Sequence, residues 1–461
     1  MPMRGWPAWA RVSDILDLLR LSGPIAVSRA SIMLMSLTDV IVLGQNAPKE
    51  LPFVLNAWLP IGVSLGLGGG LLLGVSILTA ELSATGKVSD TGRVFRRGFW
   101  FSIWFGGLLT LVIALGATSL YSVLGFDAQT AAGSASVTRI LAYGLVGHML
   151  THVAGSYLEA LRRPGIVTTI MYVGVVANLV VDLAFVAGWG GMPQLGADGV
   201  ALATTGTRWV LVVVFLVLVW KVTPAFRPSE TGPPNEARRQ MTVGFGSAIS
   251  NIAEWGGFNF TFIIATWISL AVNTVYGMSI QVVGLCFMEF LGLGTATSVR
   301  VAEAYGRRDV EGVRNASRLG VVACVLVASL LGVLVWLLRD VLASVLAKPD
   351  ALVDGVLIRP EVAAVLGFVG LIVIFDGMQN VSSMALRAQN VTWLPSVIHL
   401  SSYFGLMIPL TWFFGLHLGR GAQGMMEGVF FSSVFAGLGQ TLLLELKTAS
   451  QQRAGRRSEI S

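Results

Sequence analysis

The segment GVSILTAELSATG at residues 74–86 decides the fold, because a related segment, GTATSVRVAEAYG, follows at residues 294–306. The two segments share a glycine at each end and an alanine two positions before the last glycine, and they lie 220 positions apart. An apolar chain that contains the same sequence pattern twice has the layout of a two-lobed membrane carrier. Such carriers place their binding site between the repeats.

Two shorter matches extend this duplication. The tripeptide Ala-Leu-Arg at residues 160–162 recurs at residues 385–387, and the pattern Gly-Ala-x-Gly at residues 196–199 recurs at residues 421–424. Both second copies lie 225 positions after the first. The matches keep their order along the chain, which indicates two lobes built on one scaffold.

The composition is that of a membrane protein. Of 461 residues, 54% are hydrophobic and 12% are charged, whereas a soluble globular domain carries about 25% charged residues. Apolar stretches long enough to cross a hydrocarbon core recur along the chain. Backbone polar groups in lipid must be satisfied within the segment, so these stretches are predicted to be helices. The fold class is therefore an all-α polytopic membrane protein.

The pattern predicts twelve transmembrane helices in two lobes of six. The predicted spans are residues 21–44, 51–80, 96–118, 135–157, 166–187, 197–220, 241–268, 273–302, 316–338, 361–385, 394–416 and 422–446. We assign residues 1–222 to an N-lobe and residues 223–240 to a proline-rich inter-lobe linker. The C-lobe is predicted at residues 241–447 and a cytoplasmic tail at residues 448–461.

The distribution of Lys and Arg predicts the orientation. Loops on the side of the N-terminus hold 23 of these residues and the opposite loops hold 5. By the positive-inside rule, both termini are expected to be cytoplasmic and the protein is expected in the inner (plasma) membrane. The net charge of +6 is loop charge and does not indicate nucleic-acid binding. The two cysteines, Cys286 and Cys324, lie in apolar runs and predict neither a disulfide framework nor a thiolate metal site.

Five carboxylates inside the predicted spans are the main candidates for function. A charged side chain at the bilayer centre costs about 2.5–3.5 kcal/mol, so the set would cost on the order of 12–17 kcal/mol if ionised and unpaired. These side chains must therefore face an interior cavity, carry a proton or bind a cation. The five residues are Asp39, Asp182, Glu254, Glu289 and Asp376.

In the N-lobe, Asp39, Asn178, Asp182 and Thr204 are predicted to lie at a similar depth in three spans. Asn178 and Asp182 are four residues apart and share a helix face. Two carboxylates, an amide and a hydroxyl form an oxygen-rich site that could hold Na⁺ or a shared proton. The structural alternative is hydrogen bonding between helices. Arg208, one turn beyond Thr204, could face the same site, and pairing with one carboxylate is the favoured interpretation.

In the C-lobe, Glu254 and Asp376 are predicted near mid-membrane without a basic neighbour on their own helices. We favour a functional role for both, with pairing to a nearby amide as the alternative. The role of Glu289 stays open. His148 and His152 have the spacing of metal ligands but no third ligand nearby, so a packed pair is favoured. No metal is predicted other than Na⁺.

The chain resembles the multidrug and toxic compound extrusion (MATE) family, and within it the bacterial NorM-like branch. The resemblance covers roughly residues 20–445. It rests on the order and spacing of several segments over twelve spans, among them LTDVIVLG (37–44), LEALRR (158–163), NLVVD (178–182), GADGVALAT (196–204), SVRVAEAYGRRD (298–309) and DGMQNV (376–381).

This resemblance implies a V-shaped carrier that exports organic, often cationic, compounds in exchange for Na⁺ or H⁺, with no cofactor. Asp39, Asn178, Asp182 and Thr204 match the N-lobe cation site of the family. Glu254 and Asp376 match the C-lobe acidic pair of the bacterial Na⁺-coupled branch. Arg208 departs from the family pattern, and it joins Glu289 and Gln379 as a candidate modulator.

The predicted function is secondary active multidrug efflux by a monomer in the lipid bilayer, acting on small organic cations. An exporter or flippase of a lipid-linked metabolite is the nearer alternative, but it would require a cationic cavity for phosphates. An ion channel or an intramembrane enzyme is the alternative of another class. An enzyme would need a nucleophile–base pair or a metal set, so no enzymatic activity is expected. Because the acidic positions do not recur between the halves, we expect two distinct ion sites.

Overall fold

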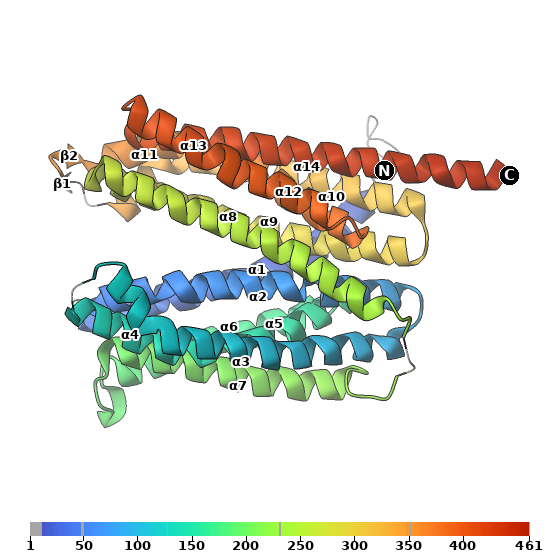
Figure 1. The fold of residues 1–461 in the computed structure, drawn as a ribbon, viewed down its shortest axis with the longest axis horizontal. Coiled ribbons are helices and arrows are strands. Elements are labelled where there is room, and N and C mark those ends of the chain that lie inside the picture. The colour runs from blue at the N-terminus through green and yellow to red at the C-terminus, as the bar shows by residue number, and fades with distance from the viewer. Residues whose placement is uncertain are drawn as a thin grey trace. The chain divides into compact units, whose positions relative to one another are not determined.

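A computed structural model describes residues 12–47, 50–126, 128–229, 232–347, 349 and 352–460. Among these residues, the first half of the chain contains seven α-helices (Figure 1). They are α1 (Val12–Asn46), α2 (Leu51–Ala84), α3 (Thr91–Val123), α4 (Ala128–Ala142), α5 (Gly144–Ala160), α6 (Pro164–Phe185) and α7 (Gly196–Val222). Two single turns, η2 (Val88–Asp90) and η3 (Trp189–Gly191), lie in the connections.

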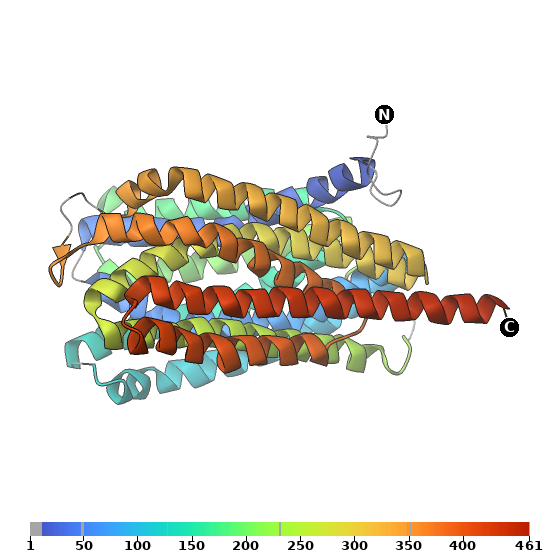
Figure 2. The ribbon, with the colours of Figure 1, turned by 90° about the horizontal axis from the view of Figure 1, so that it is seen from above.

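The second half is also helical. Its elements are α8 (Glu236–Ile268), α9 (Leu270–Gly306), α10 (Val310–Leu346), α11 (Ile358–Ala388), α12 (Trp393–Leu400), η4 (Ser401–Met407), α13 (Ile408–Thr411), η5 (Trp412–His417) and α14 (Gly421–Ile460). A hairpin of β1 (Leu352–Val353) and β2 (Val356–Leu357) joins α10 to α11. Seen from above, α14 is the long red helix that ends at the C-terminus (Figure 2).

The twelve predicted spans are confirmed as helical segments, with ends that differ by several residues. Within the described residues, ten segments are long and apolar enough to cross a membrane. The other two spans are the α4–α5 pair, whose helices have 15 and 17 residues, and the more polar α8. The chain is thus an all-α membrane protein. The last helix extends to Ile460, so the residues predicted as a tail continue α14.

The span predicted at residues 135–157 is two helices that meet at Tyr143. The break leaves carbonyl oxygens without partners in the helix, and buried carbonyls need donors. Side chains of neighbouring helices supply them, because Thr110 donates to the Ala142 oxygen at 2.8 Å, Thr205 to the Ile140 oxygen at 2.9 Å and Trp209 to the Tyr143 oxygen at 3.1 Å. The span at 394–416 is likewise irregular, since η4 and η5 are π-helical.

The chain divides into two compact units. One contains residues 27–248 and the other contains residues 1–26 and 249–461. The division falls inside α1 and α8, and not in the loop at 223–240. The assignment of residues 1–222 and 241–447 to two lobes stays a prediction, and residues 1–11 lie outside the described part of the chain.

The repeated glycines have a shared structural reason. A Cβ atom at Gly74 of α2 would lie 2.2 Å from the Gln240 oxygen of α8, closer than any carbon can approach. A Cβ atom at Gly294 of α9 would lie 2.5 Å from Asn380 Oδ1 of α11. In each unit the repeat segment therefore lies where two helices touch. Only glycine fits at Gly74, where the neighbour is backbone, whereas at Gly294 the neighbours are the side chains of Asn380 and Met384.

Ion pairs join the beginning of α8 to α2 and α3 within the unit of residues 27–248. Glu236 accepts two hydrogen bonds of 2.9 Å from Arg93, and Arg97 also pairs with it. Arg239 forms a two-pronged pair with Glu81, in which one bond measures 2.6 Å. Such bidentate pairs fix the relative position of the helices as well as the charges. The first turns of α8 thus belong structurally to the unit that precedes them.

Candidate functional site

The structure brings together the four residues predicted as the N-lobe site. Asn178 of α6 donates from Nδ2 to Asp39 Oδ1 of α1 at 2.7 Å and to Asp182 Oδ2 at 2.7 Å. Thr204 of α7 donates to Asp39 Oδ2 at 3.0 Å. We call these four residues the Asp39 cluster. One amide nitrogen thus bridges two carboxylates that come from different helices.

The Asp39 cluster is enclosed, and part of it has no partner. Asp39 and Thr204 are 3% and 2% exposed, and Asn178 and Asp182 are fully buried. Asn178 Oδ1 and Asp182 Oδ1 are buried oxygens without a hydrogen-bond donor. An unsatisfied buried acceptor costs about 1–3 kcal/mol, and more if it is charged. The cluster therefore presents two oxygen atoms that a cation or a proton would satisfy.

Arg208 lies close to this cluster but is not paired with it. Its side chain is 6% exposed and interacts electrostatically with Asp39. Within the described part of the chain it forms no ion pair shorter than 4 Å, and its Nη1 has no hydrogen-bond partner. The direct pairing favoured from the sequence is therefore absent among the described residues.

The predicted C-lobe pair also meets across helices. Gln379 of α11 donates from Nε2 to Glu254 Oε1 of α8 at 3.3 Å and to Asp376 Oδ1 at 3.4 Å. Tyr403 of η4 donates to Glu254 Oε1 at 3.2 Å. We call these four residues the Glu254 cluster. All four are at least nine-tenths buried, and Gln379 Oε1 has no partner.

One member of the Glu254 cluster, Tyr403, and two residues near the cluster were not predicted as site residues. Tyr403 supplies the hydroxyl, and the ring of His399 lies edge-on to it with 5.8 Å between ring centroids. Arg387, counted from the sequence as a loop residue, is 3% exposed, and it donates to Ser383 and, at 2.5 Å, to Ser250. The available signal was the spacing of His399 and Tyr403, which are two polar rings one helical turn apart in an apolar span.

The two clusters have the same design although their residues occupy different positions in the halves. In each cluster, the amide and one carboxylate lie on the same helix. The amide donates to that carboxylate and to a second carboxylate on another helix. In each, a hydroxyl from a third element donates to the second carboxylate. In each, the amide oxygen is left without a donor. The sequence predicted that the acidic positions do not recur, and the structure shows that the arrangement nevertheless does.

The remaining candidates lie outside these clusters. Glu289 of α9 is partly exposed and belongs to neither set of hydrogen bonds. His148 and His152 form a stacked pair with 6.1 Å between ring centroids. In the described residues no group of three His, Cys, Asp or Glu side chains could hold a metal ion. Each of the two clusters instead contains two carboxylates, and its other oxygen atoms belong to a neutral amide and a neutral hydroxyl.

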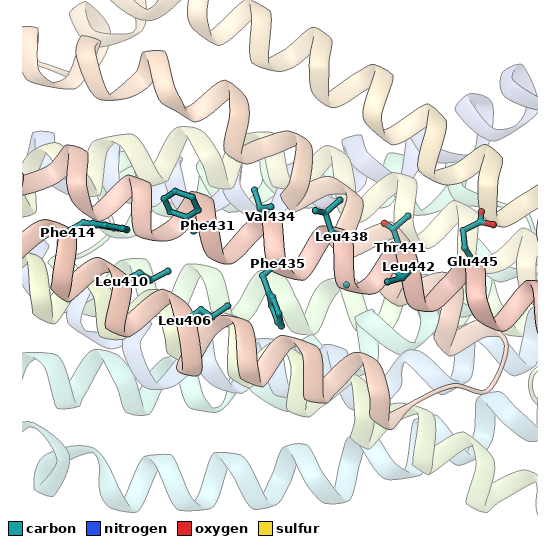
Figure 3. Close-up of a pocket in the computed structure, with 11 residues that line it drawn as sticks. Leu406, Leu410, Phe414, Phe431, Val434, Phe435, Leu438, Thr441, Leu442 and Glu445 are labelled. Atoms are coloured by element: carbon teal, nitrogen blue, oxygen red, sulfur yellow. The ribbon is translucent and has the colours of Figure 1, made fainter.

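A groove of about 1000 Å³ runs between α14 and the segment from η4 to η5 (Figure 3). Its lining is almost entirely apolar and includes Phe414, Phe431, Phe435, Leu438 and Leu442, with Glu445 at one end. Glu445 is engaged by Arg318 in two hydrogen bonds of 2.8 and 2.7 Å. None of the residues of the two clusters lines this groove. Apolar side chains on a membrane-spanning helix are suited to contact with lipid chains.

Comparison with known proteins gives consistent relationships. The MatE family model matches residues 24–184 and 247–413. A probable multidrug resistance protein NorM of Caulobacter vibrioides is 32% identical over 92% of this chain and 90% of its own length. A protein of the same description from Pseudomonas aeruginosa is 26% identical over 97% of this chain and 92% of its own length.

The fold is also that of solved structures. A crystal structure of a MATE protein in complex with MaL6 superposes with a TM-score of 0.87, over 95% of this chain and 97% of the other, at 17% identity. The family model covers well over half of the chain, and the first relative is more than 30% identical over nearly its full length. Members of this family are transporters and not enzymes. The chain belongs to the MATE family, on its bacterial NorM-like branch.

Proposed function

We propose that this protein is a secondary active multidrug efflux transporter, which exports small organic cations from the cytoplasm in exchange for Na⁺ or H⁺. The single observation that carries the proposal is the pair of buried clusters in which an amide bridges two carboxylates and leaves oxygen acceptors without donors. In this proposal, the protein acts as a monomer in the inner membrane, with both termini in the cytoplasm.

The argument for a cation starts from electrostatics. Two ionised carboxylates buried close together repel one another, and an amide donor alone does not neutralise them. The favourable states are those in which a cation or a proton enters. Carboxylate, amide and hydroxyl oxygens are the ligands that hard cations such as Na⁺ accept, by analogy with Ca²⁺ and Mg²⁺. Each cluster is thus a candidate site for the coupling ion.

The efflux direction and the drug substrates are supported by the relatives, which are described as multidrug resistance proteins. A cationic substrate and a coupling cation would compete for the same carboxylates. Ion entry would then favour release of the substrate, provided that the ion prefers one conformation of the carrier. This difference in affinity is the coupling free energy between the two ligands.

The experiment that tests this proposal is transport in proteoliposomes under a Na⁺ gradient or an H⁺ gradient, imposed separately. One of the gradients is expected to drive movement of a fluorescent organic cation. The Asp39→Asn and Asp376→Asn variants are expected to lower the driven rate by at least about tenfold, because each removes one charge that holds the cation.

Asp340→Asn is the matched control, since Asp340 is an exposed acid on α10 whose ion pair with Arg339 is long, at 3.9 Å. Its transport rate is expected to equal that of the unmodified protein. Two results would rule out the antiport proposal. One is full gradient-driven transport by both Asp39→Asn and Asp376→Asn, and the other is dye movement that depends on neither gradient.

A further inference from the structure

Arg208 is a buried charge that the proposed mechanism has not used. It lies on α7 one turn after Thr204, so the two side chains share a helix face. The side chain is 6% exposed, and its Nη1 is buried without a partner. Burying a guanidinium without full hydrogen bonding is costly, and such residues inside membrane spans mark functional sites.

The surroundings of Arg208 provide space and leave its charge uncovered. At Gly144 of α5 a Cβ atom would lie 3.3 Å from both Cδ and Nη1 of Arg208, and at Gly147 it would lie 3.5 Å from Arg208 Cβ. Gly144 thus leaves room beside the guanidinium, whereas at Gly147 a Cβ atom would make an ordinary van der Waals contact with the arginine. The carbonyl oxygens at the break between α4 and α5 already accept from Thr205 and Trp209. The helix break does not need the guanidinium as a donor.

Arg387 of the other unit shows the contrasting case. It is also buried, and it interacts electrostatically with Glu254. Its two terminal nitrogens, however, donate to the hydroxyls of Ser383 and Ser250, which come from α11 and α8. Arg387 is therefore anchored beside its cluster, whereas one end of Arg208 is not held.

We propose that Arg208 is a tethered counter-cation of the Asp39 cluster, which competes with the coupling cation and thereby sets the affinity of this site. The inference rests on the proposed function, because it requires the cluster to bind that cation. A guanidinium keeps its charge at any physiological pH. An arriving ion thus meets a cluster whose negative charge is already partly compensated. After the ion leaves, the flexible arginine can cover the carboxylates.

The test measures cation affinity in the Asp376→Asn background, in which the Glu254 cluster lacks one charge. Na⁺ affinity is measured by titrating purified full-length protein with NaCl. Choline chloride replaces NaCl so that the ionic strength stays constant. The half-saturating proton concentration of dye transport is measured without Na⁺. Arg208→Gln and Arg208→Met remove the charge, and Arg208→Lys retains it. Two neutral variants are used so that a folding defect in one does not decide the result.

Both neutral variants are expected to bind the coupling cation about tenfold more tightly or more, as one charge within about 10 Å produces at an effective dielectric constant of about 20. Arg208→Lys is expected to stay within about threefold of the parent. Adding Asp39→Asn to Arg208→Gln is expected to abolish the gain. Tight binding should also slow release, so maximal transport should fall while the half-saturating cation concentration falls.

Any of the following results would overturn the proposal: equal or weaker cation affinity in both neutral variants, a lysine variant that behaves like the neutral ones, or a gain in affinity that survives Asp39→Asn. The absence of detectable cation binding in parent and variants alike would also overturn it. If the unmodified protein shows no antiport at all, the proposed function fails. If antiport is intact and the cation affinity does not depend on the charge at position 208, only the present inference fails.

Discussion

At the scale of single residues, Asn178 and Gln379 determine how the acidic groups are arranged. Each amide nitrogen donates to two carboxylates at once, and each amide oxygen has no donor. An aliphatic side chain at either position would leave two buried carboxylates facing each other without a shared donor. Because the acids lie on different helices, the amide also fixes the distance between those helices.

Replacement of Gln379 by Leu is therefore expected to lower gradient-driven transport by at least about tenfold, through the loss of a hydrogen bond to charged groups worth about 1.5–3 kcal/mol. The rate is measured in proteoliposomes with equal amounts of folded protein. Gln389→Leu is the control, because Gln389 is a buried amide that directly follows the last residue of the same helix and donates, among the described residues, to the Ala385 oxygen. Equal losses in both variants would show that the loss at Gln379 reflects packing of a buried amide and not its bridge between the two carboxylates.

At the scale of helices, close contacts at glycines bring neighbouring helices together. Gly74 brings α2 against α8, and Gly294 brings α9 against α11, the helix that carries Asp376 and Gln379. Helices in lipid associate through packing and hydrogen bonds, since burial of apolar surface from water does not drive them together. A side chain inserted at Gly74 must separate the two helices, because its neighbour there is the backbone of Gln240.

Gly74→Ala is expected to destabilise the protein by about 1–3 kcal/mol, as overpacking does in a filled core, and to lower the melting temperature in detergent. Gly107→Ala is the control, because a Cβ atom on this glycine of α3 meets nothing within 4 Å. It should be neutral or stabilising, since alanine favours a helix by up to about 1 kcal/mol over glycine. A melting temperature for Gly74→Ala at or above that of the control would contradict the close-contact argument.

At the scale of the whole molecule, the positive-inside rule gives a prediction of orientation. Ser229, in the loop between α7 and α8, is expected on the cytoplasmic side, and Arg420, before α14, on the opposite side. Both native cysteines are buried, so single cysteines introduced at these positions can be labelled selectively with a membrane-impermeant maleimide. In intact cells only the cysteine at position 420 should react. Labelling at position 229 alone would invert the proposed topology.

Much of the fold and part of the site followed from the sequence. Its hydrophobic runs predicted all twelve helical segments, and the cost of charge in lipid singled out Asp39, Asp182, Glu254 and Asp376. The break at Tyr143 was missed, because the side chains that satisfy its carbonyls come from α3 and α7. Tyr403 was missed for the same kind of reason, since its partner Glu254 lies 149 positions away in the chain.

The sequence by itself determined that the chain spans a membrane as a duplicated set of helices and carries acids where lipid disfavours them. Both properties depend on local composition and on the identity of single residues. Only the tertiary structure decided that an amide bridges each pair of acids, that Arg208 remains unpaired, and that the two halves build one arrangement from different positions. Those facts depend on which helices are neighbours and on the position along each helix at which they touch. Packing over the whole unit determines both.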